Sequence, residues 1–244
     1  MHSKRSGFTL IEVALFLAIT GILFASVTIG VQNSIFQQRE NDAVQNFVEF
    51  LKTAYSETMN VESLGGGRSE KAIYGKLITF GATSEGKNAI YTYDVVGDVG
   101  DVGTGSVIEA LRSLNADVTI SEDGSVKPAG IVENYKPRWS AMIEKTDSFT
   151  PFVGEVMIIR HPKSGTIYTF VRKKENDPLN IEEAGALKAA LKDFSIENVD
   201  FCVNPTGGEK RNNRRDVRIV SGARNSTGVQ LISDNESLCN DVEN

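Results

Sequence analysis

Lys4-Arg5-Ser6-Gly7-Phe8-Thr9-Leu10-Ile11-Glu12 is the stretch that decides the fold of this chain. Two basic residues and a glycine precede an apolar run, Phe8 to Val31, which is 24 residues long and contains one acid, Glu12. At about 1.5 Å rise per residue, such a run forms a helix of roughly 36 Å, which is long enough to cross a bilayer. An acid in a membrane helix costs roughly 2.5–3.5 kcal/mol at mid-membrane, so we expect Glu12 to have a functional partner.

The run does not have the pattern of a secretory signal peptide. Such a peptide has an apolar region of about 7–15 residues and a small-residue cleavage site after it. Here the run is longer, and no Ala-x-Ala follows it. Lys4 and Arg5 precede the run, so the positive-inside tendency predicts residues 1–7 in the cytoplasm and the C-terminal bulk outside. An ordinary single-pass anchor would explain the length and the orientation, but neither the Gly7-Phe8 step nor Glu12.

The segment Gly7-Phe8-Thr9-Leu10-Ile11-Glu12-Val13 resembles the class III signal motif of type IV pilins and type II secretion pseudopilins. The resemblance covers residues 1–55. It implies that a prepilin peptidase cleaves after Gly7 and that the new terminal residue, Phe8, is N-methylated. It also implies that Glu12 serves assembly by facing the amino terminus of a neighbouring subunit.

Physical chemistry agrees with this role for Glu12. A carboxylate and an ammonium group attract strongly in a low dielectric when the geometry brings them together. The alternative is that Glu12 is a tolerated acid near a helix N-terminus, where the helix dipole favours negative charge modestly. The resemblance further implies a single-pass protein of the cytoplasmic membrane that then enters an extracytoplasmic filament or the cell surface. Its implied partners are the peptidase, other pilin subunits, the assembly platform and the membrane.

The helix is predicted to continue beyond the membrane. Apolar residues recur at three- and four-residue steps, as on one helical face: Phe36, Ala43, Val44, Phe47, Val48, Leu51, Tyr55 and Met59. Gly65-Gly66-Gly67 ends the pattern. We therefore expect a leader at 1–7, a helix at 8–60 with 8–31 transmembrane, and a globular head at 61–244. In the family, the second half of this helix packs on the head.

The head is predicted to consist mainly of antiparallel strands, which gives an α+β fold together with the long N-terminal helix. The clearest hairpin is 152–160 with 166–172, because the residues between them are turn formers. Helices are expected at 106–115 and at 181–194, the second one capped by Asn180. Other strands are expected at 72–80, 88–96, 118–121, 139–143, 198–203, 217–220 and 228–232.

Catalytic chemistry is scarce in this head. No nucleophile elbow, phosphate loop or zinc-protease motif occurs, so we predict a protein that is not an enzyme and needs no cofactor or metal. His161 is interpreted as a turn residue. Asp94, Asp98 and Asp101 could hold calcium, but their spacing differs from an EF-hand and favours a plain loop.

Cys202 and Cys239 are predicted to form a disulfide, since two cysteines in an exported head suit an oxidising compartment. The family often closes its C-terminal region in this way. Separate reduced thiols are the alternative.

A basic segment lies between the two cysteines. Its members are Lys210, Arg211, Arg214, Arg215, Arg218 and Arg224. One interpretation is a solvated loop that neutralises neighbouring acids; the other is a patch for DNA or another anionic surface, as in some DNA-binding minor pilins. Because we expect the loop to be exposed, replacing Arg214 and Arg215 should not disturb folding. Loss of the leader would change the formal net charge from −6 to −8, which disfavours non-specific nucleic-acid binding by the whole surface.

The sequence thus predicts a pilin-like filament subunit, and the size of the head favours a minor pilin or pseudopilin. The first alternative is a DNA-binding minor pilin of a competence system, and the second is a plain bitopic membrane protein. The sequence leaves open whether the machine builds pili, secretes proteins or takes up DNA.

Overall fold

The computed structural model describes residues 9–59, 71–82, 88–100, 105–122, 125–128, 133–173, 179–205, 214–233 and 236–239. The chain divides into two compact units, Met1–Asp42 and Ala43–Asn244. Helix α1 (Leu10–Met59) has 50 residues and contributes to both units. The two units are described separately below.

The first unit consists of the N-terminal part of α1. By length and composition, Leu10–Thr28 can cross a membrane, and none of it is buried. Three hydroxyl side chains in this segment donate hydrogen bonds to carbonyl oxygens one turn earlier: Thr20 to Phe16 at 2.7 Å, Ser26 to Ile22 at 2.8 Å, and Thr28 to Phe24 at 2.8 Å. These three hydroxyl groups are thus satisfied within the helix, as a lipid environment requires.

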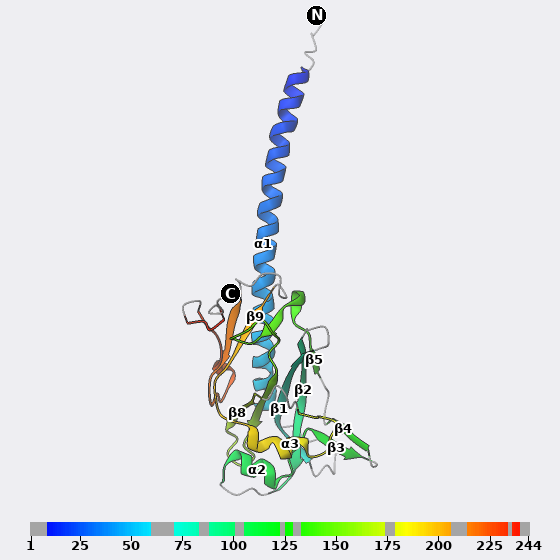
Figure 1. Ribbon diagram of the computed structural model, residues 1–244, viewed down its shortest axis with the longest axis vertical. Helices are drawn as coiled ribbons and strands as arrows, with labels where there is room; N and C mark the ends of the chain where they lie inside the picture. Colours follow the sequence, from blue (N-terminus) through cyan, green and yellow to red (C-terminus); the bar gives the residue numbers. More distant parts are fainter. Residues whose placement is uncertain are drawn as a thin grey trace, which may run out of the picture. The chain divides into compact units, whose positions relative to one another are not determined.

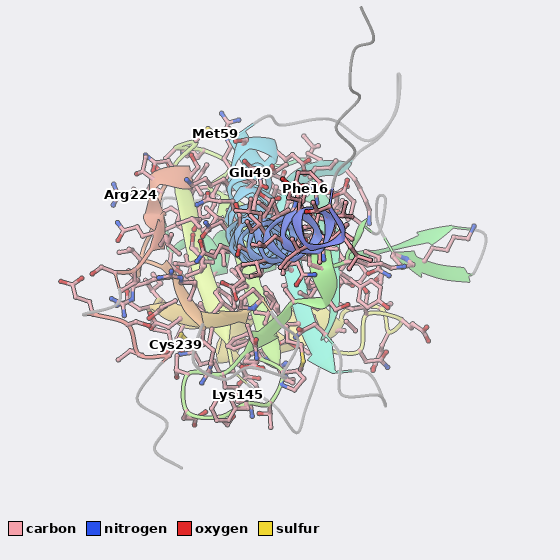
Figure 2. All side chains as sticks on the ribbon, turned by 90° about the horizontal axis from the view of Figure 1, so that it is seen from above. Phe16, Glu49, Met59, Lys145, Arg224 and Cys239 are labelled. Atoms are coloured by element: carbon pink, nitrogen blue, oxygen red, sulfur yellow. A yellow bond between two sulfur atoms is a disulfide. The ribbon has the colours of Figure 1, made fainter. Side chains whose placement is uncertain are left out.

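The second unit contains two antiparallel sheets that share one core (Figure 1). The larger sheet has the order β5-β2-β1-β7-β8, with β1 Lys71–Ala82, β2 Asn88–Asp98, β5 Glu133–Tyr135, β7 Gly154–Arg160 and β8 Ile167–Arg172. The smaller sheet has the order β11-β10-β9-β6, with β6 Met142–Glu144, β9 Val199–Asn204, β10 Arg215–Ile219 and β11 Val229–Leu231. A separate hairpin, β3 Thr119–Glu122 with β4 Ser125–Pro128, projects from the head in Figure 2.

The larger sheet is buried on both faces. Along β7, Val156 and Ile158 belong to one buried cluster, whereas Met157 and Ile159 belong to another. This alternation follows from the two-residue period of a strand. The first cluster lies between the larger sheet, α1 and the smaller sheet, and the second lies under α2 (Val107–Ser113) and α3 (Ala186–Ala190).

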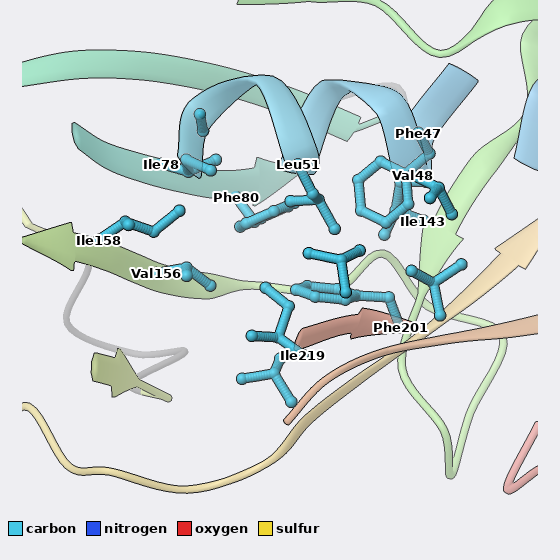
Figure 3. Close-up of a cluster of buried hydrophobic side chains, with 14 of the residues drawn as sticks. Phe47, Val48, Leu51, Ile78, Phe80, Ile143, Val156, Ile158, Phe201 and Ile219 are labelled. Carbon is cyan, nitrogen blue, oxygen red and sulfur yellow. The ribbon is translucent and has the colours of Figure 1, made fainter. Parts of the chain in front are cut away.

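The last part of α1 supplies one wall of the first cluster. Phe47, Leu51 and Tyr55 are completely buried, and Figure 3 shows Phe47 and Leu51 among strand side chains that include Phe201. The rings of Phe47 and Phe201 meet edge to face at 5.4 Å. Most of the predicted apolar face is confirmed: Ala43, Val44, Phe47, Val48, Leu51 and Tyr55 are buried. Met59 is 44% exposed, and the side chain of Phe36 lies outside the described set.

Polar contacts hold the end of α1 to the sheet. The Arg160 guanidinium donates a hydrogen bond to the carbonyl oxygen of Met59 at 2.8 Å, which satisfies an acceptor that the helix leaves open. The Tyr55 hydroxyl lies 2.6 Å from the Thr169 hydroxyl, and burial raises the pKa of Tyr55 to about 12. Lys76 on β1 bridges Glu57 of α1 and Asp94 of β2 at 2.9 and 2.8 Å.

The fold confirms the predicted α+β class and the hairpin of β7 and β8, but the predicted helix 181–194 is too long. Asn180 accepts a bond from the Glu182 amide at 3.2 Å, yet the chain then turns, and α3 begins only after Gly185, which has φ +80°. The donors at the start of α3 are instead satisfied by Asp117, which accepts from the amides of Gly185 and Leu187. A carboxylate from a distant segment therefore replaces the local cap.

The predicted strand 139–143 is also wrong in its first half. Residues Arg138–Ser140 form a 3₁₀ turn, with Trp139 and Ser140 at φ 57° and 61°, values that no strand adopts. β6 starts at Met142 and pairs with β9 on one side. The Asn88 side chain also bonds to the backbone of β6: it accepts from the Ile143 amide at 2.6 Å and donates to the Ile143 carbonyl at 2.8 Å. The Phe152 amide donates to the same carbonyl at 2.8 Å, next to a bridge between Glu144 and Pro151.

The other predicted strands and the helix at 106–115 match observed elements within a few residues. β4 and β5 are strands that the sequence did not indicate.

Candidate functional site

The start of α1 is built around Thr9 and Glu12. The backbone amide and the hydroxyl of Thr9 both donate to Oε2 of Glu12 at 2.8 Å. The Glu12 amide in turn donates to the Thr9 hydroxyl at 3.4 Å. Thr9 directly precedes the first helical residue, so the two side chains form a reciprocal capping box. Glu12 thereby begins the helix as well as carrying a charge.

This arrangement leaves the Glu12 carboxylate accessible. Glu12 lies on the exposed surface of α1, and no described residue bonds to its second oxygen, Oε1. A carboxylate with one engaged and one open oxygen can accept a further charge-assisted bond from a positive group. The predicted cleavage and methylation residues, Gly7 and Phe8, lie outside the described residues.

The helix around Glu12 presents apolar side chains on all sides. Leu10 is 88% exposed and Phe24 is 77% exposed, and most other large apolar residues up to Ile35 are more than half exposed. A helix that is apolar all round is suited to lipid or to the packing of other apolar helices. This segment therefore has no buried face of its own in the first unit.

The structure places Arg214 inside the head rather than in an exposed loop. Its side chain is completely buried, with Nε 3.1 Å from Oε2 of Glu144, which is also buried. The guanidinium donates to the carbonyl oxygens of Lys145 and Ser148, and it lies 4.7 Å from the ring centroid of Phe149. Burial lowers the pKa of Arg214, and Glu144 opposes that shift. The expectation that Arg214 lies in an exposed loop is therefore wrong, and its dispensability for folding loses the basis on which it was predicted.

The other predicted basic residues are divided between different environments. Arg218 pairs with Asp200 on the adjacent strand, and this hydrogen bond raises the pKa of Arg218. Arg215 and Arg224 are exposed, and Figure 2 shows Arg224 at the rim of the head. Lys210 and Arg211 lie outside the described residues. Among the described members, only Arg215 and Arg224 are exposed.

The disulfide prediction is confirmed: Cys202 of β9 is bonded to Cys239, and both are buried. The bond holds the C-terminal segment against the smaller sheet. Beside it lies Asp216, which faces Cys202 across the strand pair and is completely buried. Its Oδ2 accepts from the Leu238 amide at 3.1 Å, while Oδ1 has no hydrogen-bond partner among the described residues. Burial is the main cause that raises the pKa of Asp216.

The residues considered for metal binding are dispersed. Asp94 pairs with Lys76, and Asp98 accepts from the Asn115 amide group at 2.8 Å. Asp101 lies outside the described residues. Within the part of the chain that the structure describes, no three His, Cys, Asp or Glu side chains form a group that could hold a metal ion. His161 lies directly after β7, in the predicted turn.

Two features of these sites were missed in the sequence. The spacing Thr9-x-x-Glu12 is a capping-box pattern before an apolar run, so the role of Thr9 could have been predicted. The network around Arg214 had no such signal. Glu144 and Asn204, whose side chains are 3.0 Å apart in a hydrogen bond, are 60 residues apart in sequence, and only strand pairing brings them to Arg214.

Comparison with known proteins identifies one feature of this chain. Residues 2–28 match the prokaryotic N-terminal methylation motif, which is the signature of type IV pilins and pseudopilins. No curated protein and no solved structure matches the chain. The match covers the residues around Gly7, the capping box and the membrane-capable part of α1, and it supports a type IV pilin-like or pseudopilin precursor.

Proposed function

We propose that this chain is a structural subunit of a type IV pilus or type II secretion-type filament. In this proposal a prepilin peptidase cleaves after Gly7, Phe8 is N-methylated, and the apolar helix holds the subunit in the cytoplasmic membrane until assembly. The C-terminal head lies outside the cytoplasm. The observation that carries the proposal is the methylation motif at 2–28, which includes the apolar segment Leu10–Thr28 that can cross a membrane.

The geometry of the helix start supports an assembly role for Glu12. Its carboxylate is exposed, and Oε1 is open within the described chain, so a positively charged amino terminus from a neighbouring subunit could bond there. In lipid, the pairing removes the cost of two isolated charges. The exposed apolar surface around Glu12 would then pack against the equivalent helices of other subunits.

Mass analysis of the N-terminus tests the proposal. Protein extracted from its native membrane should lack residues 1–7 and carry one added methyl group on Phe8. The Gly7→Val variant should keep its leader, because a side chain at the scissile position hinders close approach of the backbone. Gly21→Val is a matched control, since a side chain at Gly21 meets nothing within 4 Å, and it should be processed normally. An intact leader on the native protein would contradict the proposal.

A second function, DNA binding by a minor pilin of an uptake system, rests on the exposure of Arg215 and Arg224. Binding should fall as salt rises, because phosphate contacts release counterions. The double variant Arg215→Gln/Arg224→Gln should lose a salt-sensitive gel shift, whereas Lys52→Gln, an exposed charge on α1, should keep it. If the wild-type protein gives no salt-sensitive shift, the exposed arginines serve only as solvated charges.

A further inference from the structure

The head contains a cavity of about 530 Å³ between the first turn of α2 and the turn that joins β7 to β8. Five of the ten described residues that line it are apolar or aromatic: Val107, Ile108, Tyr168, Phe170 and Ile196. The rings of Tyr168 and Phe170 lie 6.3 Å apart and nearly parallel. This size, and a mainly apolar wall with a few polar groups, are typical of pockets for small organic molecules.

One of the polar groups in the wall is a buried imidazole. His161 is only 7% exposed, and its Nδ1 accepts from the amides of Lys163 and Ser164, both at 3.2 Å. Because Nδ1 is an acceptor, the ring proton resides on Nε2. No described residue accepts a bond from Nε2, although His161 lines the cavity. The cavity wall therefore contains a histidine whose Nε2–H donor has no described acceptor.

A second donor carries a full positive charge. Lys163 lies in the same turn, is exposed, and lines the cavity, and no acidic side chain among the described residues pairs with it. The described residues that line the cavity include neither aspartate nor glutamate. One ammonium group and one imidazole N–H at the edge of an apolar cavity are complementary to a carboxylate attached to an apolar body.

We propose that this cavity binds a small arylalkyl carboxylate. The aryl group would pack on Tyr168 and Phe170, and the carboxylate would accept bonds from His161 Nε2 and the Lys163 ammonium group. Aromatic rings prefer such stacked or edge contacts, which favours an aryl body over an alkyl one. This ligand site is independent of the filament role of α1, because all of its residues lie in the second unit.

Methyl NMR of the full-length protein in lipid nanodiscs tests the site, with phenylpropionate as the probe. The isoleucine methyl signals of Ile108 and Ile196 should shift on titration. Those of Ile78 and Ile158, which belong to the other buried cluster, should not. The neutral analogue phenylpropionamide should produce weaker shifts, because it lacks the charge that Lys163 attracts. The proposal is overturned if Ile108 and Ile196 do not respond at millimolar probe, or if amide and carboxylate bind equally.

Two variants separate this site from non-specific binding. Lys163→Gln should weaken phenylpropionate binding about two- to fivefold, the usual contribution of an exposed ion pair, without weakening phenylpropionamide binding. Lys192→Gln removes an equally exposed charge that does not line the cavity, and it should leave the affinity unchanged. Ile196→Trp, at a half-exposed position, should fill the cavity and abolish the Ile108 shift. Equal effects of the two lysine variants would contradict the assigned role of Lys163.

Discussion

The two ends of α1 have the same secondary structure but bury different surfaces. Between Leu10 and Thr28 the helix is apolar all round and has no buried face. Between Ala43 and Tyr55 it is apolar on one side only, and that side is buried in the second unit. The second segment packs on the rest of its own unit, whereas we expect lipid or other chains to cover the first. Substitutions should therefore affect assembly in the first case and head stability in the second.

The largest effect is expected at Glu12, in the first segment. Glu12→Gln removes the charge, yet a glutamine at this position can still accept from the Thr9 amide and preserve the capping box. We therefore expect the variant to insert into the membrane and to fold its head normally. Its amount in sheared filaments should fall at least about tenfold below the wild type, which corresponds to ~1.4 kcal/mol or more of docking free energy.

Glu49→Gln is the matched control, because Glu49 is an exposed acid on the second segment of the same helix. It should enter filaments at the wild-type level. Wild-type incorporation of Glu12→Gln would show that the charge of Glu12 is not needed for docking.

The next largest effect is expected at Phe47, in the second segment. Phe47→Ala leaves a cavity among Phe80, Tyr135 and Phe201 and should lower the free energy of unfolding of the head by about 3–5 kcal/mol. Denaturant unfolding followed by far-ultraviolet circular dichroism measures it. Phe16→Ala, at a 66% exposed position of the first segment, should leave head stability within about 0.5 kcal/mol. A similar decrease in the free energy of unfolding for Phe47→Ala and Phe16→Ala would contradict the proposed difference between the two segments.

The same contrast between buried and exposed positions applies to two adjacent arginines of the head, Arg214 and Arg215. Arg214→Ala removes the cation that lies 3.1 Å from the buried Glu144 carboxylate and should destabilise the head by about 3 kcal/mol. Arg215→Ala changes the adjacent, exposed arginine and should cost less than about 0.5 kcal/mol. Thermal unfolding of both variants decides the point. Equal melting temperatures of the two variants would contradict the burial of Arg214 and favour the exposed position that the sequence predicted.

The smallest effect on the stability of the head is expected from substitution of Asp216, and this effect should depend on pH. Burial raises its pKa in the folded state, so the folded protein retains this proton at pH values where the unfolded chain has lost it. Stability from this group is therefore greatest below about pH 4, the unfolded value, and decreases as pH rises through the folded pKa.

Asp216→Asn keeps an acceptor for the Leu238 amide but cannot ionise. The variant should unfold at a higher temperature than the wild type near neutral pH, and the difference should shrink toward pH 4. Asp42→Asn, an exposed acid on α1, should leave the pH dependence unchanged. If the difference in unfolding temperature between Asp216→Asn and the wild type grew toward low pH, it would contradict a raised pKa of Asp216 in the folded state.

The sequence by itself determined the N-terminal part of this protein. The motif around Gly7 and Glu12, the apolar run and the one-sided face at 43–55 are local patterns, and local patterns follow from helix periodicity and from the chemistry of single residues. The disulfide between Cys202 and Cys239 was also predictable, because the head had two cysteines and an expected oxidising compartment.

Only the tertiary structure decided what the polar residues of the head do. No local pattern around Arg214, Asp117 or Asn88 indicates its role. Arg214 is buried against Glu144, Asp117 caps α3, and Asn88 bonds to the Ile143 backbone of β6. Their partners lie 55 to 70 residues away in sequence. The physical reason is that a buried polar group must be satisfied by whatever the fold brings near it, and strand pairing, not local sequence, chooses that neighbour.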